Sequence, residues 1–409
     1  MKYKISVLLL FLFFSCVPYR TYIEQLLKDN PVQFGKILSD PAKYRVQIIY
    51  TRIDRNKNNI PRFKTYTYRL NDSEYFYPAS TVKLPVALLS LEKLNELGID
   101  SLDMNTTMLT DSAWSGQEKI SFDSTAPDKL PSIGHYIKRL FVVSDNDAYN
   151  RLYEFLGPCY INEKLQEKEY TGTRIIHRFA PLSREENMHT NPIRFVDKSG
   201  KLIYQQPLAW CDKNFTSPVP VNIGVGYISG DSLINRPKDF SSSNCLPLTA
   251  LHEFVISVIF HETVPGSRRF NLSENDFRYI MKCMSEYPRE SLFPVYDEKH
   301  YTDNYVNFLM FGTSKDHIPG QFRIFNKVGL AYGFLSDAAY IVDFENSIEF
   351  LLSAVIYVNE DGIINDDKYE YDSVGLPFLS QLGQLIYRQE LKRHHKFKPD
   401  LSYFEFKYD

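Results

Sequence analysis

The chain has 409 residues, which is enough for one large domain or two. Its 47 lysines and arginines nearly balance 50 aspartates and glutamates, so the net charge is −3, and 44% of the residues are hydrophobic. This composition excludes an intrinsically disordered chain, and the lack of a basic stripe argues against a nucleic-acid partner.

The N-terminal residues have the pattern of an export signal. Lys2 and Lys4 precede an apolar run over residues 5–14, which is too short to span a bilayer as a stable helix. The run ends at Ser15-Cys16, a small residue followed by cysteine, which resembles the lipobox of bacterial lipoproteins. We therefore expect residues 1–16 to be a lipoprotein signal, with lipid attachment at Cys16 and a periplasmic or cell-envelope location. The alternative is a plain secretory signal that is cut a few residues later.

The predicted strands lie near both ends of the chain, most of the predicted helices lie between them, and one helix lies at each end. We expect strands over residues 45–53, 65–70, 323–325, 338–343 and 350–358. We expect helices over residues 21–27, 80–94, 132–143, 146–155, 248–260 and 376–392. Residues 181–319 otherwise look irregular. This order favours an α/β (α+β) fold, in which an antiparallel sheet flanked by terminal helices packs against a helical lobe.

Four cysteines remain after the signal: Cys159, Cys211, Cys245 and Cys283. Four thiols in an exported chain allow three complete pairings, and the sequence does not choose among them. Their spacing matches no zinc motif, and the histidines are scattered, so we expect neither a metal nor a cofactor.

One candidate nucleophile stands at the head of an apolar helix, in Ser80-Thr81-Val82-Lys83. Residues i and i+3 share a helix face, so Lys83 can lie beside the Ser80 hydroxyl. A buried amine next to a hydroxyl is one way to make serine a nucleophile at neutral pH. Taken alone, the same pattern also fits a capping serine and a solvated lysine.

Two further motifs follow in the chain. Ser144-Asp145-Asn146 opens a predicted helix and could be a simple N-cap, and Lys327-Val328-Gly329 lies on a predicted strand. In this order the three motifs resemble S-x-x-K, S-D-N and K-T-G of the serine β-lactamase and penicillin-binding protein superfamily, and class A β-lactamases most closely. The resemblance implies one catalytic domain over 21–409, with a sheet lobe at about 21–75 and 321–409. The helical lobe would cover about 76–320 and carry an insertion within 182–320.

The resemblance also implies roles for the motif residues. Ser80 would attack a carbonyl and form an acyl-enzyme, Lys83 would take its proton, and Ser144 would relay a proton to the leaving nitrogen. Asn146 and Lys327 would bind the substrate, as would Gly329 and Leu330, with the backbone N–H groups of Ser80 and Leu330 forming the oxyanion hole.

The sequence departs from the family pattern at two positions. Val328 replaces a hydroxyl residue that helps to hold a carboxylate, so binding of carboxylated β-lactams should weaken. Ala180, in Arg178-Phe179-Ala180-Pro181, stands where class A enzymes carry the glutamate that activates the deacylating water. Glu185 and Glu186 are possible substitutes for it, although solvated loop charges explain them equally well.

Three functions are compatible with these observations. The first is a serine hydrolase of the class A β-lactamase type, and the second is a penicillin-binding-type hydrolase of cell-wall peptides with slow deacylation. The third is a non-catalytic binding lipoprotein. For the enzymes we expect a β-lactam or cell-wall peptide as substrate, a monomer, and contact with a membrane only through the lipid anchor.

Overall fold

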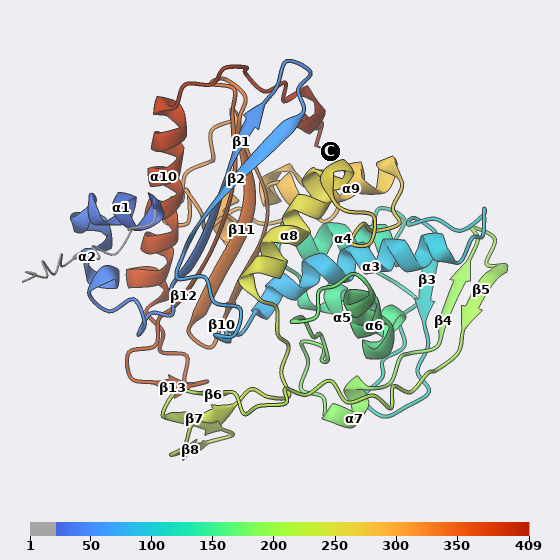
Figure 1. Cartoon of the computed structure of the whole chain (residues 1–409). Coiled ribbons are helices and arrows are strands. Elements are labelled where there is room, and N and C mark those ends of the chain that lie inside the picture. The colour runs from blue at the N-terminus through green and yellow to red at the C-terminus, as the bar shows by residue number, and fades with distance from the viewer. Residues whose placement is uncertain (1–21, 409) are drawn as a thin grey trace, which may run out of the picture.

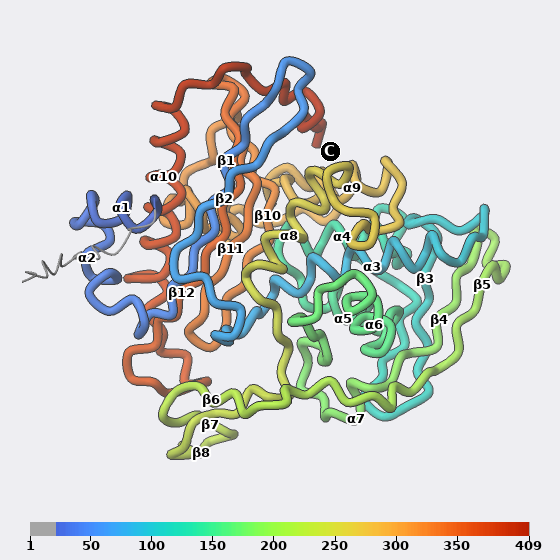
Figure 2. The backbone as a smooth tube through the Cα atoms, viewed as in Figure 1, coloured from blue at the N-terminus to red at the C-terminus, as the bar shows by residue number. Residues whose placement is uncertain are grey.

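The structure is a computed structural model that describes residues 22–408, so the predicted signal and Cys16 lie outside it. Its centre is a five-stranded antiparallel sheet in the order β10-β11-β12-β1-β2 (Figure 1). The strands are β1 (Gln47–Arg55), β2 (Pro61–Tyr68), β10 (Phe322–Ala331), β11 (Phe334–Asp343) and β12 (Ile348–Tyr357). Strands from both ends of the chain therefore build one sheet, which the tube in Figure 2 traces from blue to red.

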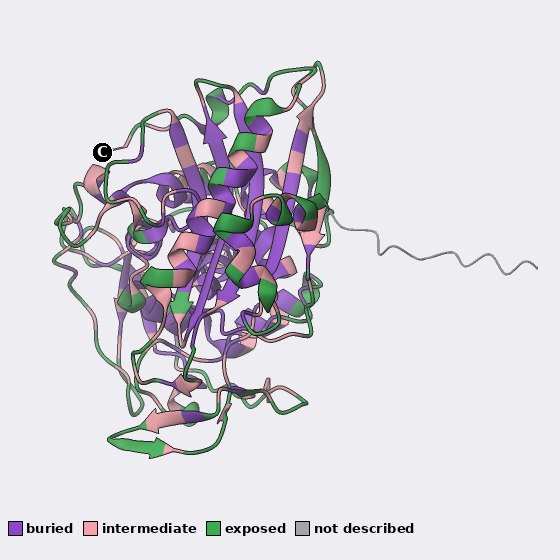
Figure 3. Ribbon diagram, turned by 90° about the vertical axis from the view of Figure 1, so that its left-hand side faces the viewer, coloured by how far each residue is buried: buried purple, intermediate pink, exposed green. Residues whose placement is uncertain are grey.

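Both faces of the sheet are covered, which explains the nearly continuous hydrophobic sequence of its central strands. Along β12, Phe350 and Leu352 enter one core, whereas Leu351 between them enters the other. Successive side chains of a strand point to opposite faces, so a strand buried on both sides must be apolar throughout. Figure 3 shows the sheet as the most buried part of the molecule.

Three helices cover the outer face: α1 (Tyr22–Lys28), α2 (Pro31–Ser39) and α10 (Leu376–Lys392). The inner face packs against α8 (Leu248–Ile259) and α9 (Glu274–Ser285), beyond which the helical lobe begins (Figure 1). The predicted α/β fold, with an antiparallel sheet flanked by helices, is confirmed.

The helical lobe surrounds one central helix, α3 (Lys83–Glu96), most of whose residues are buried. Around it lie α4 (Ile133–Val142), α5 (Asn146–Leu156) and α6 (Pro158–Glu167), and a small sheet of β3 (Thr107–Thr110), β4 (Ile193–Val196) and β5 (Leu202–Gln206) flanks them. A helix that is buried along most of its length packs on nearly all sides, so the side chains of α3 are held in place by its neighbours.

The expectation that residues 181–319 hold only one regular element is wrong. Besides α8, this region contains α7 (Arg184–Asn187) and α9, and α9 begins with a capping box between Ser273 and Asp276. It also contains six short strands: β4 and β5 of the small sheet, and then β6 (Asn222–Ile223), β7 (Gly226–Ser229), β8 (Ser232–Ile234) and β9 (Lys238–Asp239).

The strands β6 to β9 form a small β-unit below the main sheet (Figure 1). β7 pairs in parallel with β13 (Ile363–Ile364), which follows the last strand of the main sheet. The backbone N–H of Val225 also donates to the carbonyl of Gly362 at 2.8 Å. These pairings tie the β-unit to the end of the main sheet, so its position is fixed although its outer strand is exposed.

Over the described residues the structure has one disulfide, so it shows none of the three complete pairings of the four cysteines. Cys159, on α6, forms a disulfide with Cys211, 52 positions later, whereas Cys245 and Cys283 are free thiols. Within residues 22–408, no helix is both long enough and apolar enough to cross a membrane.

Candidate active site

Ser80 lies in a short 3₁₀ turn, η1 (Ala79–Val82), that leads directly into α3. The residue before it, Ala79, has a φ of 45°, a left-handed conformation that costs a non-glycine residue about 1–3 kcal/mol. The turn is held by Thr81, whose hydroxyl and backbone N–H both donate to the carbonyl of Pro78, at 2.7 and 3.0 Å. The fold thus fixes the serine at the end of a sharply bent segment.

The Lys83 side chain is fully buried and its amine joins two of the sequence motifs. Its Nζ lies 2.9 Å from Ser80 Oγ, 2.7 Å from Asn146 Oδ1 and 3.3 Å from Ser144 Oγ, and it also donates to the carbonyl of Ser144. Burial lowers the pKa of Lys83 well below its ordinary value, and the nearby charge of Lys327 lowers it further. A neutral amine at this distance can accept a proton from the Ser80 hydroxyl.

The Ser144 loop connects α4 to α5 and is held in place by its neighbour Asp145. One oxygen of Asp145 caps α5 by accepting from the N–H of Ala148 at 3.0 Å. The other accepts two bonds from Arg139 on α4, at 2.8 and 3.1 Å. Ser144 itself has a φ of 57°, so this clamp also maintains a strained residue facing Lys83.

Lys327 lies on β10, the edge strand of the main sheet. Its Nζ donates to Ser144 Oγ at 2.8 Å and to the carbonyl of Val328 at 3.1 Å. Burial lowers the pKa of Lys327 from 10.5 to about 7. Ser144 Oγ therefore lies between two amines, which can donate to it while its own proton is directed at a substrate.

β10 packs closely against the nucleophile segment at Gly329. A Cβ atom on this residue would lie 2.4 Å from the carbonyl oxygen of Pro78, so only glycine fits. The neighbouring Val328 side chain is buried, whereas that of Leu330 is 41% exposed. The backbone of β10 thereby runs alongside Ser80.

A buried carboxyl on β11 supports this end of β10. Asp337, opposite Val328 in the register, accepts from the N–H groups of Phe308 and Leu309 at 3.1 and 3.0 Å and from the Asn326 amide at 2.9 Å. Burial raises the pKa of Asp337 to about 6, against the opposing effect of these hydrogen bonds. The carboxyl fixes the preceding loop to the strand that carries Lys327.

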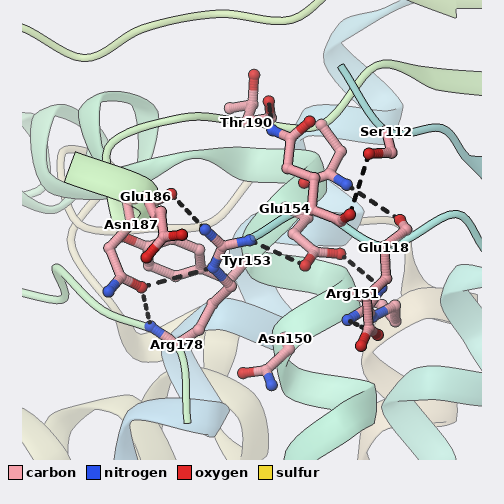
Figure 4. A network of polar contacts seen from close by, with 12 residues as sticks. Ser112, Glu118, Asn150, Arg151, Tyr153, Glu154, Arg178, Glu186, Asn187 and Thr190 are labelled. Atoms are coloured by element: carbon pink, nitrogen blue, oxygen red, sulfur yellow. Dashed lines mark hydrogen bonds and ion pairs between the residues drawn. The ribbon is translucent and has the colours of Figure 1, made fainter. Parts of the chain in front are cut away.

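The loop containing Ala180 is anchored at a buried arginine, as Figure 4 shows. Arg178 Nη1 lies 3.0 Å from Glu154 Oε1 on α5, and the Arg178 backbone N–H donates to Asn187 Oδ1 at 2.8 Å. Each charge of a buried ion pair needs its partner. If the loop left the helical lobe, Glu154 would be buried without Arg178, so this ion pair holds the loop in place.

The next residue brings an aromatic ring to the site. The backbone N–H of Phe179 donates to Asn150 Oδ1 at 2.8 Å, and its ring centre lies 5.2 Å from Lys83 Nζ. Ala180 follows and is exposed. The side chain that this loop places against Lys83 is therefore a phenyl ring.

The structure does not bring the carboxylates of Glu185 and Glu186 into contact with Ser80 or Lys83. Glu186 completes the capping box of α7 by accepting from the N–H of Ser183 at 2.8 Å, and it also accepts from the Ser115 hydroxyl at 3.0 Å. Glu185 is exposed on the same short helix. Among the described residues, neither carboxylate has a hydrogen bond with Ser80 or Lys83.

Sequence reasoning missed three supporting residues: Arg139, Asn150 and Asp337. Asn150 had a usable signal, because it lies four positions after Asn146 on the same helix and so shares its face. Arg139 and Asp337 act through contacts between separate elements, which the spacing of residues along the chain does not reveal.

Comparisons with known proteins find one family and several solved structures that are similar to this chain. Residues 38–203 match a family described as "Beta-lactamase enzyme family". The solved structure of PBP-A is 13% identical with a TM-score of 0.50, covering 90% of this chain and 97% of that one. A class A β-lactamase from Clostridium kluyveri is 16% identical with a TM-score of 0.48, covering 88% and 98% respectively. No curated protein sequence matches the chain.

Proposed function

Because residues 38–203 match a family described as "Beta-lactamase enzyme family" and the three motifs resemble those of the serine β-lactamase and penicillin-binding protein superfamily, we propose that the chain belongs to this superfamily and is a serine hydrolase of the class A β-lactamase type. It forms a covalent acyl-enzyme at Ser80 and hydrolyses a β-lactam or a related amide. The observation that carries this proposal is the buried Lys83 amine, 2.9 Å from Ser80 Oγ, whose pKa is lowered by burial.

In the acylation step, the neutral amine of Lys83 takes the hydroxyl proton of Ser80, and Ser80 Oγ attacks the substrate carbonyl carbon. The carbonyl oxygen becomes negative, and the backbone N–H groups of Ser80 and Leu330 stabilise it, each at about 3–4 kcal/mol. The positive charge that Lys83 has just gained lies close by and favours the same intermediate.

Collapse of the intermediate breaks the bond between carbon and the leaving nitrogen, which must gain a proton. Ser144 Oγ is 3.3 Å from Lys83 Nζ and 2.8 Å from Lys327 Nζ, so it can give its proton to the nitrogen and recover one from Lys83. Asn146, bonded to Lys83 at 2.7 Å, keeps the amine aimed at this relay. These contacts return Lys83 to its neutral form once acylation is complete.

A second candidate is a penicillin-binding-type hydrolase, in which the acyl-enzyme on Ser80 persists. It is favoured by the loop after Arg178, which presents Phe179 to Lys83 and carries Ala180 instead of a carboxylate. The carboxylate of Glu186 is occupied by Ser183 and Ser115. Without a base to activate water, deacylation is slow while acylation is unaffected.

To test both candidates, the soluble chain that starts after Cys16 is mixed with a chromogenic cephalosporin. Absorbance reports hydrolysis of the cephalosporin, and intact mass reports the covalent adduct. We expect one adduct per chain, absent in Ser80→Ala. Steady turnover supports the β-lactamase, and an adduct without turnover supports the slow-deacylating candidate. An unchanged mass together with unchanged absorbance would contradict both.

We also propose that the chain is exported and anchored to a bacterial membrane by lipid on Cys16. The Cys159–Cys211 disulfide supports an oxidising compartment. Metabolic labelling with a fatty acid in the producing cell should mark the wild-type chain and not Cys16→Ser. Equal labelling of both chains would refute the anchor.

A further inference from the structure

A cavity of about 270 Å³ lies beside the nucleophile segment. Its walls come from the segment before Ser80, from residues 176–188 around α7, from residues 215–216, from β9 and the residues after it up to 243, and from the turn between β10 and β11. Aromatic rings dominate one side, where Tyr77 lies 5.0 Å from Tyr332 and 5.7 Å from Phe240 between ring centres.

The cavity adjoins the groups proposed to react. Tyr77 precedes Ser80 by three positions, and Tyr332 follows Leu330 by two. His177 forms part of the same wall, and its ring lies 6.0 Å from that of Phe179, which contacts Lys83. A substrate held at Ser80 can therefore extend one substituent into this space.

The charged side chains of the cavity wall are cationic. Lys238, on β9, places its Nζ 4.9 Å from the ring centre of Tyr227, and Arg184, on α7, donates to Asn214 Oδ1 at 2.9 Å. Neither forms an ion pair within residues 22–408, and no aspartate or glutamate lines the cavity. The adjacent Asp239 is engaged with the Ser241 hydroxyl and backbone N–H.

The two cations come from different elements, and each of these elements is held in place. The pairing of β7 with β13 secures the β-unit that carries Lys238, and the buried bond between Arg178 and Glu154 secures the loop that carries Arg184. A pocket with aromatic walls and two unpaired cations favours a group that combines an apolar portion with a carboxylate.

We propose that this cavity selects substrates whose acyl portion carries a carboxylate, and that Lys238 and Arg184 bind it. The inference rests on the proposed acylation of Ser80. It is also compatible with Val328, because β10 lacks a hydroxyl at this position to hold a carboxylate, whereas Lys238 and Arg184 in the cavity can bind one.

Three penicillins that differ only in side-chain charge test the proposal. Benzylpenicillin is neutral there, carbenicillin adds a carboxylate at the same carbon, and ampicillin adds an ammonium group. We expect the second-order rate constant for acylation, followed by intact mass, to be highest with carbenicillin and lowest with ampicillin.

In the double variant Lys238→Gln/Arg184→Gln, the ratio of carbenicillin to benzylpenicillin should fall about tenfold, as expected for losing hydrogen bonds to a charged group. The rate with benzylpenicillin should stay close to that of the wild type, which also reports that the variant is folded. Arg236→Gln is the matched control, because it removes an exposed cation from the same β-unit outside the cavity and should leave the ratio unchanged. If the double variant keeps the wild-type ratio of carbenicillin to benzylpenicillin acylation rates, the inference is wrong.

If the proposed acylation of Ser80 is wrong, none of the three compounds forms an adduct, which distinguishes this case from a wrong assignment of the cavity. Equilibrium binding of phenylacetate and of its neutral amide, phenylacetamide, then tests the cavity, measured by calorimetry on the wild type and the double variant. Tighter binding of phenylacetate that disappears in the double variant supports the carboxylate site, and equal affinity for the acid and the amide overturns it.

Discussion

The free-energy cost of burying Lys327 can be measured with Lys327→Met. The side chain is 1% exposed, and burial lowers its pKa from 10.5 to about 7. A lysine whose pKa is lower in the folded chain than in the unfolded one penalises folding wherever the unfolded chain is protonated. The penalty is full below about pH 7, shrinks by about 1.4 kcal/mol per pH unit above it, and vanishes near pH 10.5.

The full penalty is about 5 kcal/mol, because the two pKa values differ by about 3.5. The Lys327 amine partly offsets this penalty through its hydrogen bonds to Ser144 Oγ and to the Val328 carbonyl, each of which contributes about 1.5 kcal/mol. Methionine fills a similar volume without a charge. We therefore expect Lys327→Met to stabilise the fold by about 2 kcal/mol at pH 6.5, to lose this advantage near about pH 8.5, and to be less stable than the wild type at pH 10.

Thermal and urea unfolding of the soluble chain at both pH values measure this difference. Lys198→Met, at an exposed lysine, is the control and should change little at either pH. The Lys327→Met variant should also lose acylation, because no amine donates a hydrogen bond to Ser144 Oγ from the position of Lys327. Destabilisation at pH 6.5, or an effect of equal size at both pH values, would refute the reasoning.

Three other outcomes follow from the geometry. Ala180→Glu should shorten the life of the acyl-enzyme about a hundredfold by supplying a base for water, and Ala180→Gln, measured by the same loss of adduct mass, should not. The acylation rate should rise with pH as Lys83 loses its proton and fall above about pH 7 as Lys327 loses its own; a rate independent of pH would contradict both assignments. Replacing Cys159 and Cys211 by alanine should lower the free energy of unfolding by about 4 kcal/mol for a loop of this length, seen as a lower urea midpoint that a reductant no longer changes.

The elements that the sequence predicted well are those whose signals are local. The closing helix, α10, was predicted over 376–392 with its observed bounds, and α8 within one residue at its C-terminal end. Both have apolar residues at helical spacing. α9 was missed although Ser273 and Asp276 form a capping box, because its outer face is polar and prolines flank the region.

The short strands of the β-unit could not be predicted in this way. β7 has four residues, and it is a strand because it pairs with β8 and with β13, which lies far along the chain. The motifs of the site were recognisable because each lies within a few residues. The cavity beside them depends on Lys238 and Arg184 coming together from different elements, which requires the folded chain.

The position of β1 in the sheet determines the order in which the molecule can fold. β1 lies between β2 and β12, and its Gln47 pairs with Val355, 308 positions later (355 − 47). A hairpin of two strands is marginally stable by itself, and an unpaired edge invites association with other chains. The β1–β2 hairpin therefore keeps one edge unpaired until the last third of the chain has been synthesised and β12 can pair with β1. The helices that lie between β2 and β10 in the sequence can pack before that. A chain interrupted before residue 348 would leave that edge permanently exposed, so incomplete synthesis should yield aggregates instead of a smaller folded protein.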